Sequence, residues 1–155
     1  MPLVYEAQEQ SNWCWISCVR MACSYFGRAA PPPCEIANRF LGLTNCCNDG
    51  STNQCNSPLA TDKISQLFSA FDLAAETKSI DDGAMQQDLS AGALMLLFLS
   101  FPEGEHFAIL SGYDAVRKQY SVQDPRYGPF PAPYIYVQTA YNLGSLSLCW
   151  SISAP

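Results

Sequence analysis

The apolar residues in the first seventy positions follow the spacing of helices that are buried along one side. Residues 12–26 contain neither Pro nor Gly and are followed by Gly27, which predicts a helix that stops there. A second helix is expected at about 33–41. Residues 61–71 are expected to form a third helix, because their apolar side chains fall on one stripe: Ile64, Leu67, Phe68 and Phe71.

The second half of the chain changes to the pattern of strands. Residues 93–101 are an apolar run too short for a membrane span, and they predict a buried central strand. Alternating and β-branched residues predict strands at 106–114 and 119–124, joined as an antiparallel hairpin. The remaining predicted elements are a strand near 73–77, a helix near 81–89, a stiff Pro-rich loop at 125–134 and a last strand near 145–152.

A helical first half followed by an antiparallel second half predicts an α+β fold. The 155 residues are expected to form a single domain over 1–155, with a helical lobe at about 1–90 and a β lobe at about 91–155. The substrate cleft would then be the seam between the lobes, where ligand sites tend to form.

Composition excludes several classes of function. Charged residues make up 14% of the chain and apolar residues 48%, as in globular proteins. The net charge of −6 and the lack of a Lys/Arg cluster argue against a nucleic-acid partner. No segment has the basic start and apolar stretch of a signal peptide, and no apolar run is long enough to cross a bilayer, so we expect no membrane partner.

Cys14 is the strongest candidate for a reactive residue. A cysteine nucleophile acts as the thiolate, and the unpaired N–H groups and positive dipole end of a helix N-terminus stabilise an anion. Ser11 and Asn12 are good N-cap residues, so the first helix is expected to begin close to Cys14. Gln8 lies six residues upstream, on the loop that enters this helix.

His106 is the only histidine, and therefore the only imidazole available to pair with a thiolate and to protonate a leaving amine. If the hairpin turn centres near Ala115 or Val116, His106 and Asp124 fall opposite or diagonal to each other on one face of the sheet. Asp124 would then orient the ring and stabilise its charged form. Pro125 is expected to end the strand.

Four of the eight cysteines, Cys34, Cys46, Cys47 and Cys55, cluster in a stretch rich in Pro, Gly and Asn. Eight cysteines in 155 residues predict one to three disulfides, and their connectivity is left open. A zinc site is the rival interpretation, but the cluster lacks a CxxC pair and the single histidine already has a role, so we expect no metal and no cofactor. Cys18, one helical turn beyond Cys14, is expected to be a small core residue.

Three segments together resemble the papain-like cysteine proteases, in particular compact bacterial effector and toxin-type peptidases related to bacteriocin-leader peptidase domains. They are Gln8 with Asn12-Trp-Cys-Trp15, then His106-Phe-Ala-Ile-Leu-Ser-Gly-Tyr-Asp114, and Tyr120-Ser-Val-Gln-Asp124-Pro-Arg-Tyr-Gly128. The resemblance spans most of the chain and implies a papain-like fold.

The same resemblance implies peptide-bond hydrolysis with Cys14 as nucleophile, His106 as acid/base, Asp124 as orienter and Gln8 in the oxyanion hole. Asp124 stands where papain has Asn, a difference that the smaller bacterial relatives accept. Gln10 is a rival for the oxyanion role, although the spacing favours Gln8.

We further expect the aromatic neighbours of these residues, Trp13, Trp15 and Tyr127, to line the substrate cleft. The expected partner is a protein or peptide substrate, and a cognate inhibitor or immunity protein would be a second partner. Only thirteen residues precede Cys14, too few for a propeptide that covers the cleft. This favours a secreted or delivered effector or toxin domain that acts in the cytoplasm of a target cell, over a processed product.

Three other functions stay open. Deamidases, transglutaminases and cell-wall amidases share the Cys/His/Asp chemistry up to the acyl-enzyme. A leader-peptide peptidase that works with a transporter is the second. A catalytically silent binding module is the third, and the presence of all four predicted site residues argues against it.

Overall fold

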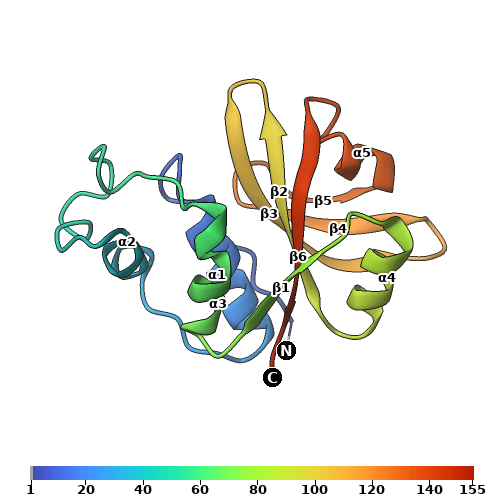
Figure 1. Cartoon of the computed structure of the whole chain (residues 1–155), viewed down its shortest axis with the longest axis horizontal. Helices are drawn as coiled ribbons and strands as arrows, with labels where there is room; N and C mark the ends of the chain where they lie inside the picture. Colours follow the sequence, from blue (N-terminus) through green and yellow to red (C-terminus); the bar gives the residue numbers. More distant parts are fainter. Residues whose placement is uncertain (1) are drawn as a thin grey trace.

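Three helices form the first lobe of the computed structural model, which describes residues 2–155. They are α1 (Cys14–Tyr25), α2 (Pro33–Leu41) and α3 (Ile64–Ser69), and a short 3-10 helix, η1 (Thr61–Lys63), leads into α3. Figure 1 shows this lobe beside the sheet, with α1 and α3 nearest to it. Each helix predicted for the first seventy residues is therefore present.

A six-stranded antiparallel sheet forms the second lobe, in the order β1-β6-β2-β3-β4-β5. Its strands are β1 (Ala74–Lys78), β2 (Leu94–Phe101), β3 (Gly104–Asp114), β4 (Gln119–Asp124), β5 (Gly128–Ala132) and β6 (Ser145–Ser153). Two helices accompany the strands, α4 (Asp82–Ser90) and α5 (Tyr134–Gln138). The predicted α+β fold, a helical lobe packed against an antiparallel sheet, is confirmed.

Strand β2 runs through the middle of the sheet and is buried on both faces. Successive side chains of a strand point to opposite faces, and those of β2 enter two separate hydrophobic cores. Leu94 and Leu96 belong to the core shared with the helical lobe, whereas Met95, Leu97 and Leu99 belong to the core on the other face. The sheet is thus a wall between two cores, and the buried strand predicted at 93–101 is confirmed.

The sheet lobe begins earlier than the predicted border near residue 90. β1 pairs with β6, and Met85 and Leu89 of α4 pack into the core on the far face of the sheet. Both elements therefore lie with the β lobe. The residues of β6 that pair with β1 lie 71 to 79 positions downstream, from Lys78↔Cys149 to Ala74↔Ser153, so the pattern of residues 74–78 alone does not indicate which lobe they join.

Residues 125–134 are not the stiff loop that their prolines suggested. Gly128–Ala132 form β5, which pairs with β4 at the edge of the sheet. Proline is tolerated in edge strands because the missing N–H can face the side without a partner strand. Pro129 and Pro131 thus occupy a strand that carries the chain away from Asp124.

Two disulfides join the clustered cysteines, Cys34 to Cys47 and Cys46 to Cys55. This agrees with the predicted one to three bridges and resolves the connectivity. Cys18 is fully buried in the core, as predicted. None of the helices within residues 2–155 has the length and apolarity that crossing a membrane requires.

Candidate active site

Cys14 is the first residue of α1, and no side chain caps this helix. The predicted caps are wrong: Ser11 and Asn12 instead bond to Asn56, through Asn56 Nδ2 to Ser11 Oγ and through Asn12 N and Nδ2 to Asn56 Oδ1 and O. The first N–H groups of a helix have no intrahelical acceptor. The positive end of α1 is therefore left for an anion at Cys14.

Trp13 and Trp15 do not line a cleft, contrary to prediction, because both are only 1% exposed. Their indole N–H groups donate to the loop that carries the second disulfide, from Trp13 to Cys55 O at 2.7 Å and from Trp15 to Ser57 O at 3.1 Å. A buried indole needs such an acceptor. The two tryptophans thus brace the start of α1 against the disulfide-bonded loop.

The β3–β4 hairpin does not by itself place the predicted histidine and aspartate on one face. Its turn centres just past Val116, because Asp114 pairs with Gln119. An uninterrupted ladder from this turn would pair Asp124 with Ile109. Side chains alternate between faces, so Asp124 would then point away from the face of His106.

A bulge at Ser111 shifts the register by one residue. The pairing changes between Leu110 and Gly112, and from there Ile109 pairs with Gln123. Continued by one residue, this register sets Asp124 opposite Ala108, whose side chain shares a face with His106. The predicted diagonal relation between His106 and Asp124 is therefore present, and the bulge is its cause.

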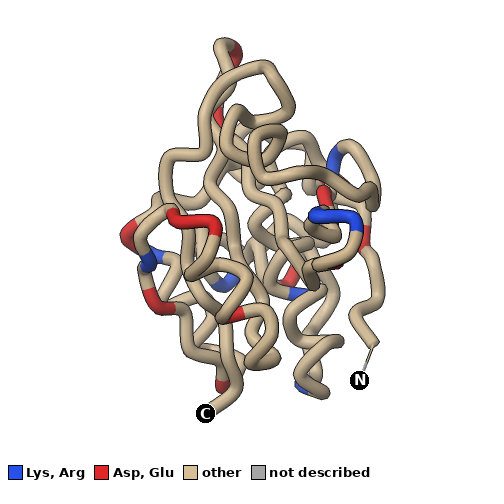
Figure 2. Tube along the Cα trace, turned by 90° about the vertical axis from the view of Figure 1, so that its right-hand side faces the viewer, with Lys and Arg blue, Asp and Glu red and all other residues tan. Residues whose placement is uncertain are grey.

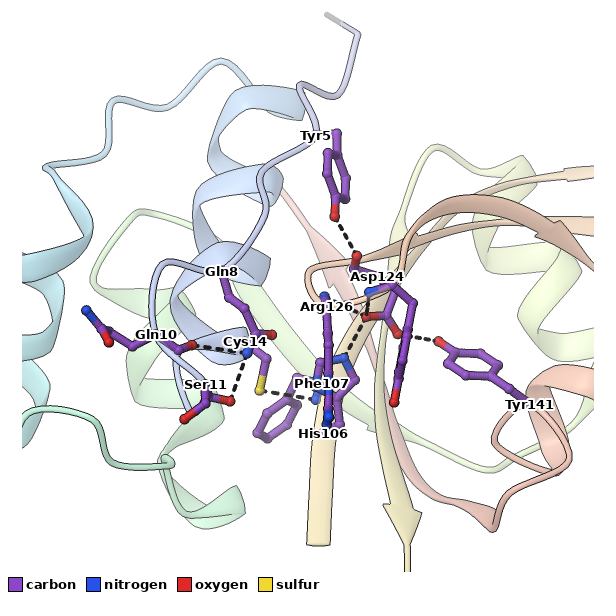
Figure 3. Close-up of polar contacts among 11 residues, drawn as sticks. Tyr5, Gln8, Gln10, Ser11, Cys14, His106, Phe107, Asp124, Arg126 and Tyr141 are labelled. Carbon is purple, nitrogen blue, oxygen red and sulfur yellow. Dashed lines mark hydrogen bonds and ion pairs between the residues drawn. The ribbon is translucent and has the colours of Figure 1, made fainter. Parts of the chain in front are cut away.

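His106 and Asp124 form a buried pair, with 4% and 0% of each residue exposed. The ring atom Nε2 lies 2.7 Å from Asp124 Oδ1. The backbone N–H groups of Arg126 and Tyr127 donate to the same oxygen at 2.8 and 3.0 Å. Figure 3 shows this network between α1 and the end of β4. The carboxylate is thus held by the turn that follows its own strand.

The sulfur of Cys14 lies close to the backbone of the residue that follows His106. The backbone N–H of Phe107 donates to Cys14 Sγ at 3.4 Å. Burial of His106 opposes its charged form, yet the pKa of the ring is raised to about 9, because hydrogen bonds to Asp124 and Cys14 and their negative charge outweigh burial. The ring is therefore an imidazolium at neutral pH, the form that pairs with a thiolate and protonates a leaving group.

Asp124 is an anion in spite of its burial. Burial raises the pKa of its carboxyl, but hydrogen bonds from His106 and Tyr141, the positive charge of the imidazolium and the N–H of Arg126 hold that pKa below its usual value. Tyr141 donates to the second oxygen, Oδ2, at 2.7 Å. Sequence reasoning missed this tyrosine, since nothing in residues 139–144 signals a link to β4.

Gln8 is the glutamine whose side chain lies beside Cys14 (Figure 3). Its Nε2 donates to the backbone oxygens of Gln10 at 3.0 Å and Ser11 at 2.8 Å, while its Oε1 is buried without a hydrogen bond in the described residues. Figure 3 shows the side chain of Gln10 pointing away from Cys14. It packs next to Gly50, where an added Cβ would lie 3.3 Å from Gln10 Nε2.

Two bonds fasten the segment that carries Gln8 to the β lobe. The backbone N–H of Gln8 donates to Pro125 O at 3.0 Å, and the Tyr5 hydroxyl donates to Asp124 O at 2.7 Å. The loop before Cys14 and the turn after Asp124 therefore hold each other in place.

A cavity of about 430 Å³ opens along this loop and reaches His106. Its lining includes Gln8, Asn12 and His106, three glutamates and Arg126. Tyr127, the third predicted cleft residue, is 46% exposed and sets its ring edge-on to that of His106, with centroids 6.2 Å apart. Of the three predicted aromatic residues, Tyr127 alone is accessible beside the histidine.

The match to known families covers most of the chain. Residues 1–132 match the family described as papain-like cysteine protease AvrRpt2. The chain belongs to this family. It is a papain-like cysteine protease, as the resemblance implied.

Solved structures of papain-like peptidase domains share the fold. A double glycine motif protease from an AMS/PCAT transporter, in complex with the leader peptide, is 15% identical with a TM-score of 0.66, over 99% of this chain and 93% of that one. The peptidase domain of Streptococcus ComA, a bi-functional ABC transporter involved in a quorum sensing pathway, is 8% identical with a TM-score of 0.71, over 99% and 100%.

A third structure is the N-terminal peptidase C39 like domain of the toxin secretion ATP-binding protein from Vibrio parahaemolyticus. It is 12% identical with a TM-score of 0.55, over 96% of this chain and 100% of that one. A comparison with curated proteins finds no match. At these identities the solved structures show a common fold alone.

Proposed function

We propose that this cysteine protease is an endopeptidase that cleaves a specific protein target through the triad Cys14, His106 and Asp124. The proposal rests on the contact between the two lobes at Cys14 and His106. The sulfur at the start of α1 lies against the N–H that follows His106, and His106 bonds to a buried, ionised Asp124.

The chemistry follows from this arrangement. The Cys14 thiolate attacks the carbonyl carbon of the scissile bond, and the electron pair of the carbonyl moves to its oxygen. As the C–N bond breaks, His106 gives its proton to the leaving amine, which leaves an acyl-enzyme. Neutral His106 then takes a proton from water, whose oxygen attacks the thioester, and the thiolate and the acid product are released.

Gln8 and the first turn of α1 would stabilise the oxyanion in both steps. The N–H of Cys14 opens the helix, and the amide of Gln8 stands beside it. Both N–H groups of that amide bond to loop carbonyls in the free protein. To donate to an oxyanion, Gln8 therefore has to break one of these two hydrogen bonds and turn that N–H toward the substrate.

Delivery from a bacterium as a secreted effector or toxin domain is part of the proposal, with action in the cytoplasm of a target cell. Two disulfides support a route through an oxidising compartment. Lys and Arg are scattered along the trace among acidic residues, without a continuous basic band (Figure 2). Glu9, Glu103 and Glu105 outnumber Arg126 in the cavity at His106, which favours neutral or basic substrate segments.

The test is to incubate the protein, or its Cys14→Ala variant, with a lysate of candidate target cells and to identify new peptide termini by mass spectrometry. We expect a small set of new termini that depend on Cys14, and the variant should keep the thermal unfolding curve of the parent. Turnover that persists in a folded Cys14→Ala protein would refute the triad. Gln residues heavier by about one mass unit, without new termini, would instead identify a deamidase that uses the same acyl-enzyme.

A leader-peptide peptidase is the second candidate, because one structure with this fold holds a leader peptide and is named for a double glycine motif. The two candidates differ in what determines cleavage. A synthetic peptide with a Gly-Gly site and a matched peptide with Ala-Ala should both resist the enzyme if it is selective for another protein target. Efficient cleavage directly after Gly-Gly, and not after Ala-Ala, would favour the leader-peptide function.

A further inference from the structure

Asp124 has a second buried partner that belongs to neither the histidine segment nor the turn after β4. The Tyr141 hydroxyl donates to Asp124 Oδ2 at 2.7 Å, and Tyr141 is 7% exposed. The other carboxylate oxygen, Oδ1, receives His106 Nε2 and the backbone N–H groups of Arg126 and Tyr127. Among the hydrogen bonds of the described residues, Tyr141 is thus the one donor to Oδ2.

The backbone that presents Tyr141 is in an unusual conformation. Ala140, Tyr141 and Asn142 have φ values of 45°, 62° and 65°, three consecutive left-handed residues without a glycine. Such residues persist only where the surroundings hold them, and they collect at functional sites. Here Tyr141 N donates to Tyr136 O at 2.7 Å, and Asn142 N donates to the Thr139 hydroxyl at 3.2 Å.

The same segment is pinned against the sheet two residues later. A Cβ added at Gly144 would lie 1.8 Å from the backbone oxygen of Ser100 in β2, so only glycine fits there. The loop from α5 to β6 is therefore fixed at both ends, and its left-handed residues turn the side chain of Tyr141 toward β4.

Aromatic rings then fix the direction of the hydroxyl. The Tyr141 ring is stacked on that of Tyr136 at 5.5 Å and meets the ring of Phe130 edge-on at 5.1 Å. Phe101 and Tyr127 lie 6.2 and 6.0 Å from it, and both of these rings also contact His106, at 6.3 and 6.2 Å. Tyr141 and His106 thus share two neighbours and one carboxylate.

We propose that Tyr141 is a positioning residue of this protease, which fixes the Asp124 carboxylate so that Oδ1 faces His106. The inference deepens the proposed function and rests on the triad described there. A carboxylate can rotate about its Cβ–Cγ bond, and a donor on Oδ2 opposes that rotation. Burial raises the pKa of Tyr141, and so does the nearby charge of Asp124, so the hydroxyl keeps its proton and remains a donor.

The test is Tyr141→Phe, which removes the hydroxyl and keeps the ring. Loss of one hydrogen bond to a charged group predicts a fall in kcat of roughly tenfold with KM unchanged. Tyr136→Phe is the matched control, since Tyr136 lies in the same ring cluster but its hydroxyl is not among the donors to Asp124. The control should retain the kcat of the parent.

A double variant separates positioning from packing. If Tyr141 acts through Asp124, Tyr141→Phe should have little further effect on kcat in an Asp124→Ala background. A fall of the same size in that background would mean that Tyr141 only supports the fold, and a parental kcat for the single variant would overturn the inference outright.

A second readout does not need the substrate. Alkylation of Cys14 by iodoacetamide at pH 6 reports the thiolate that His106 supports, and the modified peptide identifies the cysteine. The other free cysteines, Cys18, Cys23 and Cys149, are at most 1% exposed. We expect slower alkylation in Tyr141→Phe and an unchanged rate in Tyr136→Phe. If Cys14-dependent hydrolysis itself is absent, the proposed function fails, whereas a parental rate in Tyr141→Phe beside intact hydrolysis refutes only this inference.

Discussion

The backbone N–H of Phe107 donates to the sulfur of Cys14 across the seam between the two lobes, at 3.4 Å. Phe107 follows His106 in β3, so one strand carries both the imidazole and the backbone N–H that donates to Cys14. Cys14 is itself the first residue of α1. A thiolate at Cys14 would thus be stabilised from both lobes, and any shift of one lobe against the other would weaken the nucleophile and its pairing with His106 together.

Replacement of Asp124 should show a graded effect. An Asn at this position can still accept at one oxygen from His106 and from the N–H groups of Arg126 and Tyr127. Ala removes that acceptor, and it leaves the buried donors of His106 and Tyr141 without a partner. Each unsatisfied buried group costs about 1–3 kcal/mol. We therefore expect Asp124→Ala to lose more kcat and more thermal stability than Asp124→Asn, in assays of peptide hydrolysis and unfolding. The reverse order would contradict its role as orienter.

The titration of His106 can be observed directly, since it is the only histidine. Its pKa is raised from 6.5 to about 9, so the stability contributed by the charged ring is complete below pH 6.5 and is lost as the pH rises through 9. We expect the imidazole signals in NMR spectra to titrate near pH 9, and kcat/KM and the free energy of unfolding to fall over the same interval. A midpoint near 6.5 would mean that Asp124 and Cys14 do not support the charged ring.

Gln8 and Gln10 should separate in steady-state kinetics. An oxyanion donor acts only when charge develops on the carbonyl oxygen, so Gln8→Ala should lower kcat with little change in KM. By analogy with other oxyanion holes, the loss would be about 2.7–4 kcal/mol of transition-state stabilisation. The side chain of Gln10 packs beside Gly50, so Gln10→Ala should retain most of its kcat. A large loss of kcat confined to Gln10→Ala would contradict the assignment to Gln8 and would give the oxyanion role to Gln10.

The two disulfides should contribute similarly to stability, although they should differ in their effect on activity. They close loops of similar length, with sequence separations of 9 for Cys46–Cys55 and 13 for Cys34–Cys47. Paired Cys→Ala variants should therefore each lose about 3 kcal/mol of unfolding free energy.

The loss of kcat should be larger without the Cys46–Cys55 bridge. Cys55 O accepts the indole N–H of Trp13, the residue just before Cys14, whereas the other bridge ties α2 to the loop. Urea unfolding and peptide hydrolysis, measured on both paired variants, check this. Equal losses of kcat would show that the loop does not position the nucleophile.

Much of the site was readable from the sequence because its chemistry is local. A helix that begins near Cys14, a strand that opens with His106 and a strand that ends at Asp124-Pro125 each leave a pattern within a dozen residues. In the same way, the apolar stripe within residues 61–71 predicted a helix, and the continuous apolar run at 93–101 predicted the buried strand. Residues 1–132 match one protease family.

Relations between distant segments were decided only by the tertiary structure. A bulge at Ser111 set the face of Asp124, and Cys55 and Ser57 drew Trp13 and Trp15 into the core. β1 joined the sheet through β6, and β5 formed from residues whose prolines suggest a loop. Tyr141 is placed against Asp124 by a turn of left-handed residues, which no local sequence pattern predicts. In each case the partner is remote in sequence, and its hydrogen bonds and packing outweigh the local preference of the residues that it holds.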